Sequence, residues 1–188
     1  MTELKDYSGE LKPGIRYEDL SKESLVKLAK TYGRLYLLLH NFWQRTTIDR
    51  HGLGEVVATE IEIWKQQGKY EPRWICKALN IQGDDVISWM KMLQFAPLGW
   101  VPESFDYHWD IKSKDHMIVT IDRCFAAAAW EKEGDTEKIK HYCNNMEPPA
   151  FQAIGTAFNP KMKVTAVKVP PRTSDKDCYC IWDFKIER

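Results

Sequence analysis

The amino-acid sequence predicts an α+β fold in which an antiparallel sheet packs on helices. Apolar side chains recur at helical spacing through residues 20–95, and they alternate with period two in residues 105–122 and 164–186. Runs of helices and runs of strands, instead of strict alternation, are typical of α+β proteins. We therefore expect a single domain. Its expected parts within residues 1–188 are an extended N-terminal arm (1–18), a mainly helical segment (20–95), and a sheet with helices and a cysteine cluster (100–186).

Four helices are predicted in the first half of the chain. The first is expected from about 22 to 48, with Ser21 as its N-cap, because a serine hydroxyl accepts a hydrogen bond from the first helical turn. Its apolar positions are Leu25, Leu28, Tyr32, Leu35, Leu39 and Phe42. The other helices are expected at about 54–67, at a short segment opened by Pro72, and after a cap at Asp84 or Asp85.

The second half is predicted to contain two hairpins that are separated by helices. The first hairpin turns at 112–115, between segments whose apolar positions are Phe105, Tyr107, Trp109, Met117, Val119 and Ile121. An Ala-rich helix follows from Phe125 to Trp130. A second helix is expected from Asp135 through Cys143, and Pro148 opens a third. A strand at 164–169 and the final strand form the second hairpin.

The final strand, residues 178–186, shows the clearest alternation. Its apolar positions are Cys178, Cys180, Trp182, Phe184 and Ile186. Both thiols should therefore share one face with Trp182. Alternate residues of a strand are about 6.5–7 Å apart, which does not suit a disulfide between these two cysteines. We expect this strand to be central in the sheet, with its thiols facing the interior.

The composition is that of a globular protein without a charge bias. Basic and acidic residues number 27 each, so we expect neither a nucleic-acid surface nor an anionic-membrane surface. No apolar run is long enough for a transmembrane span, and the first residues lack the features of a secretory signal. A cytoplasmic location with five reduced cysteines is expected. The expected partner is a small-molecule ligand, and a homodimer is one possible assembly.

Several short segments, taken in their order along the chain, resemble a known family. They are residues 21–28 (SKESLVKL), 62–64 (EIW), 77–81 (KALNI), 122–124 (DRC), 158–160 (FNP), 169–171 (VPP) and 178–182 (CYCIW). The pattern covers about residues 20–186 and is similar to the L-2-amino-thiazoline-4-carboxylic acid hydrolase-like family and to the 4-vinyl-reductase-type ligand-binding domains. This resemblance implies a small-molecule pocket between helices and sheet, and hydrolysis of a cyclic amidine.

Four cysteines in the second half are candidates for a functional site, namely Cys124, Cys143, Cys178 and Cys180. Together they are a candidate set for zinc or an iron–sulfur cluster, although no Cys-x-x-Cys pair is present. A nucleophilic thiol is the second hypothesis, with Cys178 or Cys180 ahead of Cys143, and it needs a lowered pKa and a nearby base. Glu147 follows Cys143 by four residues, but Pro148 predicts that the helix ends before it. Burial as small hydrophobic side chains is the alternative without chemistry.

Five further residues are candidates for contact with a substrate or for proton transfer. Glu60 lies beside the apolar stripe of the second helix, where a carboxyl at a pocket rim can act as general acid or base, or remain solvated at the helix edge. Arg123 is suited to bind a substrate carboxylate, with a surface ion pair as the alternative. Trp64, Trp182 and Tyr107 are the aromatic candidates for substrate contact, with core packing as the alternative.

Three functions are compatible with these residues. The leading interpretation is a cytosolic hydrolase of C–N or C–S bonds that uses a cysteine thiol, with Glu60 or a histidine carrying protons. The first alternative is a non-catalytic small-ligand- or metal-binding module, and the second is an interaction subunit with an exposed aromatic surface. The chain lacks Walker-type, Gly-x-Gly-x-x-Gly, His-Glu-x-x-His and Gly-x-Ser-x-Gly motifs. Their absence disfavours kinases, dinucleotide-dependent enzymes, zincins and α/β-hydrolases.

Overall fold

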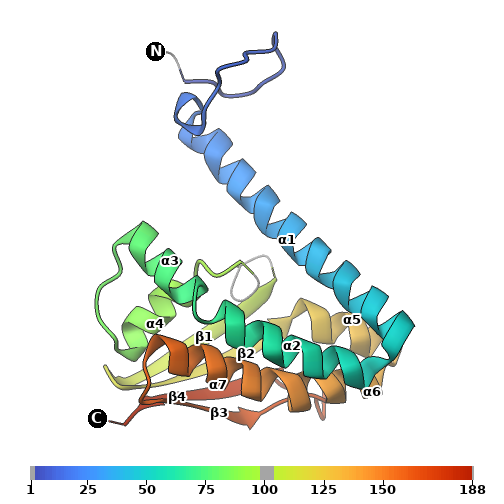
Figure 1. Ribbon diagram of the computed structural model, residues 1–188. Helices are drawn as coiled ribbons and strands as arrows, with labels where there is room; N and C mark the ends of the chain where they lie inside the picture. The colour runs from blue at the N-terminus through green and yellow to red at the C-terminus, as the bar shows by residue number, and fades with distance from the viewer. Residues whose placement is uncertain (1–2, 98–103, 188) are drawn as a thin grey trace. The chain divides into compact units, whose positions relative to one another are not determined.

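The computed structural model describes residues 3–97 and 104–187. The chain divides into two compact units, Met1–Trp43 and Gln44–Arg188. The predicted fold class is confirmed, because a helical first half is followed by a four-stranded antiparallel sheet with further helices (Figure 1). The expected start of the sheet segment at residue 100 lies outside the described residues.

The N-terminal arm is tied to the beginning of the first helix. The arm ends in a short 3-10 helix, η1 (Tyr17–Asp19). Leu4 forms a parallel bridge with Leu20. Ser21 is the N-cap that the sequence predicts, since its Oγ accepts a hydrogen bond from the backbone N–H of Ser24 at 3.2 Å. Capping and bridging therefore occur at the same place, where the arm meets the helix.

The helices of the first half are α1 (Lys22–His51), α2 (Leu53–Gln67), α3 (Glu71–Leu79) and α4 (Val86–Leu93). α1 runs past the predicted end at 48 and stops before Gly52, whose φ of +86° is a conformation that glycine adopts readily. Pro72 lies in the first turn of α3. Asp85 caps α4 by accepting a hydrogen bond from the Ser88 N–H at 2.8 Å. Within residues 3–97 and 104–187, no helix has the length and apolar character needed to cross a membrane.

The sheet has the strand order β1-β2-β4-β3. The strands are β1 (Phe105–Ser113), β2 (His116–Cys124), β3 (Met162–Lys168) and β4 (Cys180–Ile186). All three pairings are antiparallel. β4 is therefore an interior strand, as the sequence predicts. It begins at Cys180 instead of 178, so Cys178 lies outside the strand.

The helices between the hairpins form a nearly continuous stretch. They are α5 (Phe125–Glu133), α6 (Thr136–Ile139), the π-helix η2 (Lys140–Met146) and α7 (Glu147–Phe158). The expected helix through Cys143 is thus divided between α6 and η2. The predicted stop before Pro148 is wrong, because α7 follows η2 directly and Pro148 occupies its first turn. A proline is tolerated there, since the first backbone N–H groups of a helix have no intrahelical acceptor.

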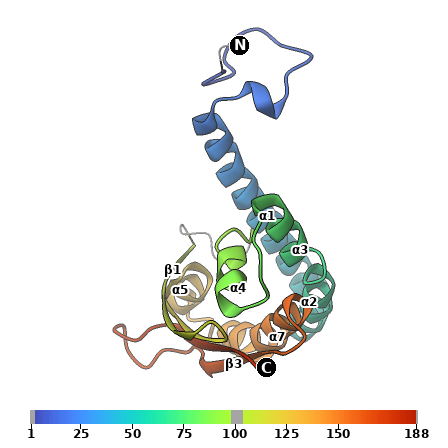
Figure 2. The same ribbon diagram turned by 90° about the vertical axis from the view of Figure 1, so that its left-hand side faces the viewer.

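The main core lies between the sheet and the helices on one of its faces. Figures 1 and 2 show α4, α5 and α7 on the same side of the sheet. The inward side chains follow the predicted period of two, namely Met117, Val119, Ile121, Trp182, Phe184 and Ile186. Trp89 of α4 fills the centre, with its ring 5.4 Å from Phe158 and 6.0 Å from Phe184. A smaller cluster joins α2 to η2 and α7.

One buried amide links distant parts of this unit, and its removal is expected to be costly. The Nδ2 of Asn159 donates to the Asp84 carbonyl at 2.8 Å, and its Oδ1 accepts from the Lys161 N–H at 2.8 Å. Asn159→Ala should lower the free energy of unfolding by about 1–3 kcal/mol, because it leaves buried backbone groups without partners. Urea denaturation measures the loss. Asn145→Ala, at an exposed position, is the matched control, and an equal effect of both changes would contradict the prediction.

Candidate functional site

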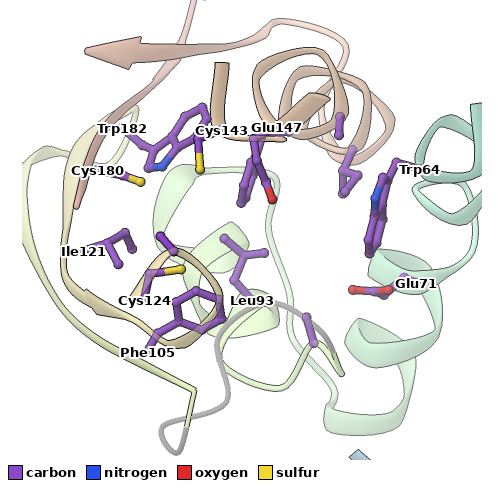
Figure 3. A pocket seen from close by; sticks show the side chains of 15 residues that line it. Trp64, Glu71, Leu93, Phe105, Ile121, Cys124, Cys143, Glu147, Cys180 and Trp182 are labelled. Atoms are coloured by element: carbon purple, nitrogen blue, oxygen red, sulfur yellow. The ribbon is translucent and has the colours of Figure 1, made fainter. Parts of the chain in front are cut away.

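A cavity of about 130 Å³ lies between the sheet and the helices of the second unit (Figure 3). Helices α2, α3, α4, α5 and α7, the π-helix η2 and strands β1, β2 and β4 contribute to its walls. Most of the lining is apolar, and its aromatic members are Trp64, Phe105, Phe151 and Trp182. Its polar members are the thiols of Cys124, Cys143 and Cys180 and the carboxyls of Glu71 and Glu147. The fold thus brings together residues that lie far apart in the sequence.

The three thiols reach the cavity from three different elements. Cys124 ends β2, Cys143 lies in the middle of η2, and Cys180 begins β4. Figure 3 shows all three side chains directed into the cavity. Cys178, a predicted nucleophile, precedes β4 and is not part of the lining. Of the four candidate cysteines, the structure therefore brings three together and leaves one outside.

Burial keeps these thiols protonated at neutral pH. It raises the pKa of Cys124 to about 11, and it is also the main cause of the raised pKa values of Cys143 and Cys180. Nearby acidic groups act in the same direction, because the Glu147 carboxylate and the neighbouring thiols disfavour a thiolate. The lowered pKa that a nucleophilic cysteine requires is therefore not provided by the protein's own groups.

Glu147 is the most unusual polar group of the cavity. Its carboxyl points into the cavity beside the side chain of Cys143, which lies four residues earlier in the chain (Figure 3). Burial raises its pKa to about 7, and the Glu60 carboxylate adds to the effect. Among residues 3–97 and 104–187, no side chain forms a hydrogen bond or an ion pair with it. At neutral pH Glu147 thus exchanges readily between the neutral and the charged form.

The second carboxyl of the cavity belongs to Glu71, in the first turn of α3. Its Oε2 accepts a hydrogen bond from the Gln67 side chain at 3.1 Å. Burial raises the pKa of Glu71, and this hydrogen bond lowers it only in part. Figure 3 shows the ring of Trp64 next to Glu71, on the same side of the cavity. Both carboxyls of the lining therefore sit in apolar surroundings that disfavour their charged forms.

Glu60, the predicted rim carboxylate, is not part of the cavity lining. It is only 3% exposed, which corrects the alternative of a solvated helix edge. Burial raises the pKa of Glu60 to about 7, and the polar groups of Gln44, Trp64 and Tyr142 lower it only in part. Trp64 is a neighbour of Glu60 and is itself part of the cavity wall. Glu60 therefore lies behind this wall and not at the opening of the cavity.

The remaining candidates lie away from the cavity. Arg123 forms a two-pronged pair with Asp106, at 2.7 Å from Nε and 3.2 Å from Nη2, so its guanidinium serves the surface ion pair. Tyr107 packs on Trp109 with ring centres 5.7 Å apart. His116 pairs with Asp183 at 2.9 Å. The Asp183 side chain lies on the sheet face opposite the core, because Asp183 alternates with the inward Trp182 and Phe184. Arg123 is exposed and follows a register shift in the β1–β2 pairing.

The cysteines do not form the metal site that was considered from the sequence. In the part of the chain that the structure describes, no group of three or more His, Cys, Asp or Glu side chains is arranged to hold a metal ion. Cys178 is displaced from the other three, and all five cysteines are free thiols. The described thiols and carboxyls of the cavity are thus not arranged as the ligands of a metal ion.

Glu147 lines the cavity but is not among the site residues that the sequence predicts. The signal that would have found it is its spacing of four residues from Cys143, combined with the tolerance of proline in the first turn of a helix. Glu71 was missed as well, since its position depends on how α3 packs beside α2 and α7. Nothing in its local sequence distinguishes it from a surface glutamate.

A family model described as a family of unknown function (DUF6125) matches residues 18–186. No curated protein and no solved structure matches the chain. The matched range contains α1, the whole sheet and every residue of the cavity lining.

Proposed function

The chain belongs to the DUF6125 family of unknown function, and we propose that it binds a small, largely apolar organic compound that carries one basic nitrogen. The size of the cavity supports a compound of about one ring. An apolar protein cavity of about 150 Å³ holds benzene, and this cavity measures about 130 Å³. The aromatic rings of Trp64, Phe105, Phe151 and Trp182 offer surfaces for stacking on such a compound.

The observation that carries the proposal is the charge of the lining. Two carboxyls line the cavity, and no lysine, arginine or histidine is among its described lining residues. A carboxylate in an apolar space is stabilised by a cation that enters beside it. A ligand amine or amidine supplies that cation and a hydrogen-bond donor for Glu147. An anionic ligand would meet acidic groups without any compensating positive charge.

A second function, hydrolysis of a cyclic amidine, is favoured by the thiols beside Glu147. In this reaction a cysteine sulfur bonds to the amidine carbon, and Glu147 passes the thiol proton to a ring nitrogen. The C–N bond then breaks, and water cleaves the C–S bond to regenerate the thiol. A bound cation would help, because a neighbouring positive charge lowers a thiol pKa. The resemblance to the thiazoline-carboxylate hydrolase-like family agrees with this activity, and five free thiols agree with a cytoplasmic location.

The binding proposal is tested with three compounds of one shape, benzamidine, benzamide and benzoate. Calorimetry should detect benzamidine binding at pH 8, with much weaker binding of benzamide and none of benzoate. Glu147→Gln is expected to weaken benzamidine binding by about ten- to a hundredfold, since it removes a charge partner in an apolar site, and to leave benzamide unchanged. Glu133→Gln removes an exposed carboxylate and is the matched control. Equal binding of all three compounds would exclude the role of the basic nitrogen.

The hydrolase candidate is tested separately by mass spectrometry of ring-opened products after incubation with small cyclic amidines. Single serine replacements of Cys124, Cys143 and Cys180 should identify the nucleophile, because only its loss abolishes turnover. Cys178→Ser is the control, since this thiol lies outside the cavity. Turnover that survives every replacement within the cavity would rule out the thiol mechanism. Binding of benzamidine without any turnover would leave the binding function alone.

A further inference from the structure

Within the first unit, helix α1 carries a long apolar stripe that the rest of this unit leaves largely exposed. The stripe consists of Leu25, Leu28, Tyr32, Leu35, Leu39 and Phe42, here called the α1 stripe. The exposed fractions of its last four residues are 49, 54, 57 and 59%. No residue of α1 is buried. A long helix in water gains most of its stability from packing such a stripe, so the exposed stripe indicates a binding surface.

The spacing of the stripe suits another helix. Its residues follow one another at alternating steps of three and four, which are the a and d positions of a heptad repeat. Side chains at these positions form a narrow seam along one side of a helix and interlock with the same seam on a facing helix. The seam spans about 26 Å at 1.5 Å per residue. The geometry thus favours a helical partner of similar length.

We propose that a second copy of this chain covers the α1 stripe, with the two α1 helices antiparallel. The stripe is symmetric about the point between Gly33 and Arg34. A two-fold axis there places Leu25 against the partner's Phe42, Leu28 against the partner's Leu39, and Tyr32 against the partner's Leu35. An interface between identical copies must be complementary to itself, and this order of residues meets that requirement.

The side-chain sizes favour the antiparallel arrangement over the parallel one. In the antiparallel pairing each aromatic ring meets a leucine of the other copy, and the central layers contain Tyr32, Leu35 and their symmetry mates. In a parallel pairing in register, Tyr32 would face the partner's Tyr32 and Phe42 the partner's Phe42, so that two bulky rings would share each of these layers. The Tyr32 hydroxyl pairs with the Tyr17 hydroxyl at 3.1 Å and is common to both arrangements, so ring size is what distinguishes them. Mixed aromatic and aliphatic layers fill the seam more evenly.

The charges on α1 favour the same arrangement. Its first half carries the basic residues Lys22, Lys27, Lys30 and Arg34 and the acidic residue Glu23, and its last two turns carry Arg45, Asp49 and Arg50. Glu23 pairs with Lys27 at 2.7 Å. Residues 35–44 contain no lysine, arginine, aspartate or glutamate. An antiparallel dimer about this axis sets Lys27 and Lys30 beside the partner's uncharged residues 35–44, and it sets Lys22 opposite the partner's Arg45. A parallel dimer in register brings all four basic residues of the first half beside their own copies and repels more strongly.

Sedimentation velocity of the full chain tests the assembly over about a hundredfold range of concentration. The wild-type chain should sediment as a dimer that dissociates on dilution. Leu39→Lys should weaken the dimer at least about a hundredfold, because each copy then places an ammonium group in the seam. Val26→Lys is the matched control. Val26 is 48% exposed and lies on the opposite side of α1. Circular dichroism shows whether both variants keep their helices.

A mixing experiment tests the orientation of the helices. Leu28→Glu and Leu39→Lys chains should each be monomeric alone and should form a heterodimer when mixed. The antiparallel pairing sets the new glutamate against the new lysine and leaves the second Leu28–Leu39 layer intact. Failure to associate on mixing, when wild type is a dimer, would overturn the antiparallel pairing. A wild-type chain that is monomeric at all concentrations would overturn the proposal. So would a monomer that sediments with vesicles of phosphatidylcholine and phosphatidylglycerol, since the stripe would then be a membrane-surface site.

Discussion

Raising the pH from 5 to 8 is expected to lower the free energy of unfolding by about 2–4 kcal/mol. The cause is the pair of carboxyls Glu60 and Glu147, whose pKa values burial raises from the ordinary 4.5 to about 7. Between pH 4.5 and 7 the folded chain binds more protons than the unfolded chain. Stability therefore falls as the pH rises through this window, and it levels off above pH 7.

The double variant Glu60→Gln, Glu147→Gln should remove most of this loss. At pH 8 it is expected to be more stable than the wild type by about the same amount, and at pH 5 the two should nearly agree. Denaturant titrations at several pH values measure both effects. Burial also raises the pKa of Glu71 and lowers that of His40. Glu71 and His40 are present in both the wild type and the double variant, so their effects cancel when the two free energies of unfolding are subtracted. A wild type whose stability is constant from pH 5 to 8 would contradict the assignment.

Phe184→Ala is expected to have the largest effect of any single change, about 3–5 kcal/mol of unfolding free energy. Phe184 is fully buried on an interior strand, and its ring lies 6.0 Å from Trp89 and 6.5 Å from Phe151. Its loss removes buried apolar area and leaves a space between α4, α7 and β4 that the surrounding rings cannot fill. Guanidinium denaturation measures the effect. Val167→Ala on β3, where the side chain is 60% exposed, should change stability by less than about 0.5 kcal/mol.

The fold could be predicted from the sequence where the local residue pattern and the burial of side chains indicate the same structure. The alternation of Met117, Val119 and Ile121 with polar residues identified the inward face of β2, because successive strand side chains point to opposite faces. The caps at Ser21 and Asp85 were identifiable from hydroxyl and carboxyl chemistry. The π-helix η2 was not identifiable, because no residue pattern used in the sequence analysis distinguishes an i→i+5 turn from an α-helical one.

The candidate site was less predictable, because it is made by contacts between distant elements. Trp64, Trp182, Cys143 and Cys180 were chosen from the sequence and do lie in the cavity lining. Each belongs to the apolar face of a helix or strand, and such a face can be recognised from the regular spacing of apolar residues in the sequence. The two carboxyls of the lining, Glu71 and Glu147, are not marked by any regular spacing in the sequence. Glu147 reaches the cavity only because η2 and α7 join without a break across Pro148.

The place of β4 in the strand order has a consequence for biosynthesis. The sheet needs residues 180–186 to join β2 to β3, and the ribosome adds these residues after those of β1, β2 and β3. The β1–β2 hairpin and the helices can form earlier, but until β4 is made one edge of β2 stays open and β3 has no neighbour in the sheet. Exposed strand edges of this kind promote aggregation of incomplete chains. Closure of the sheet is therefore a late event, and a nascent chain halted before residue 180 is a natural client for a chaperone.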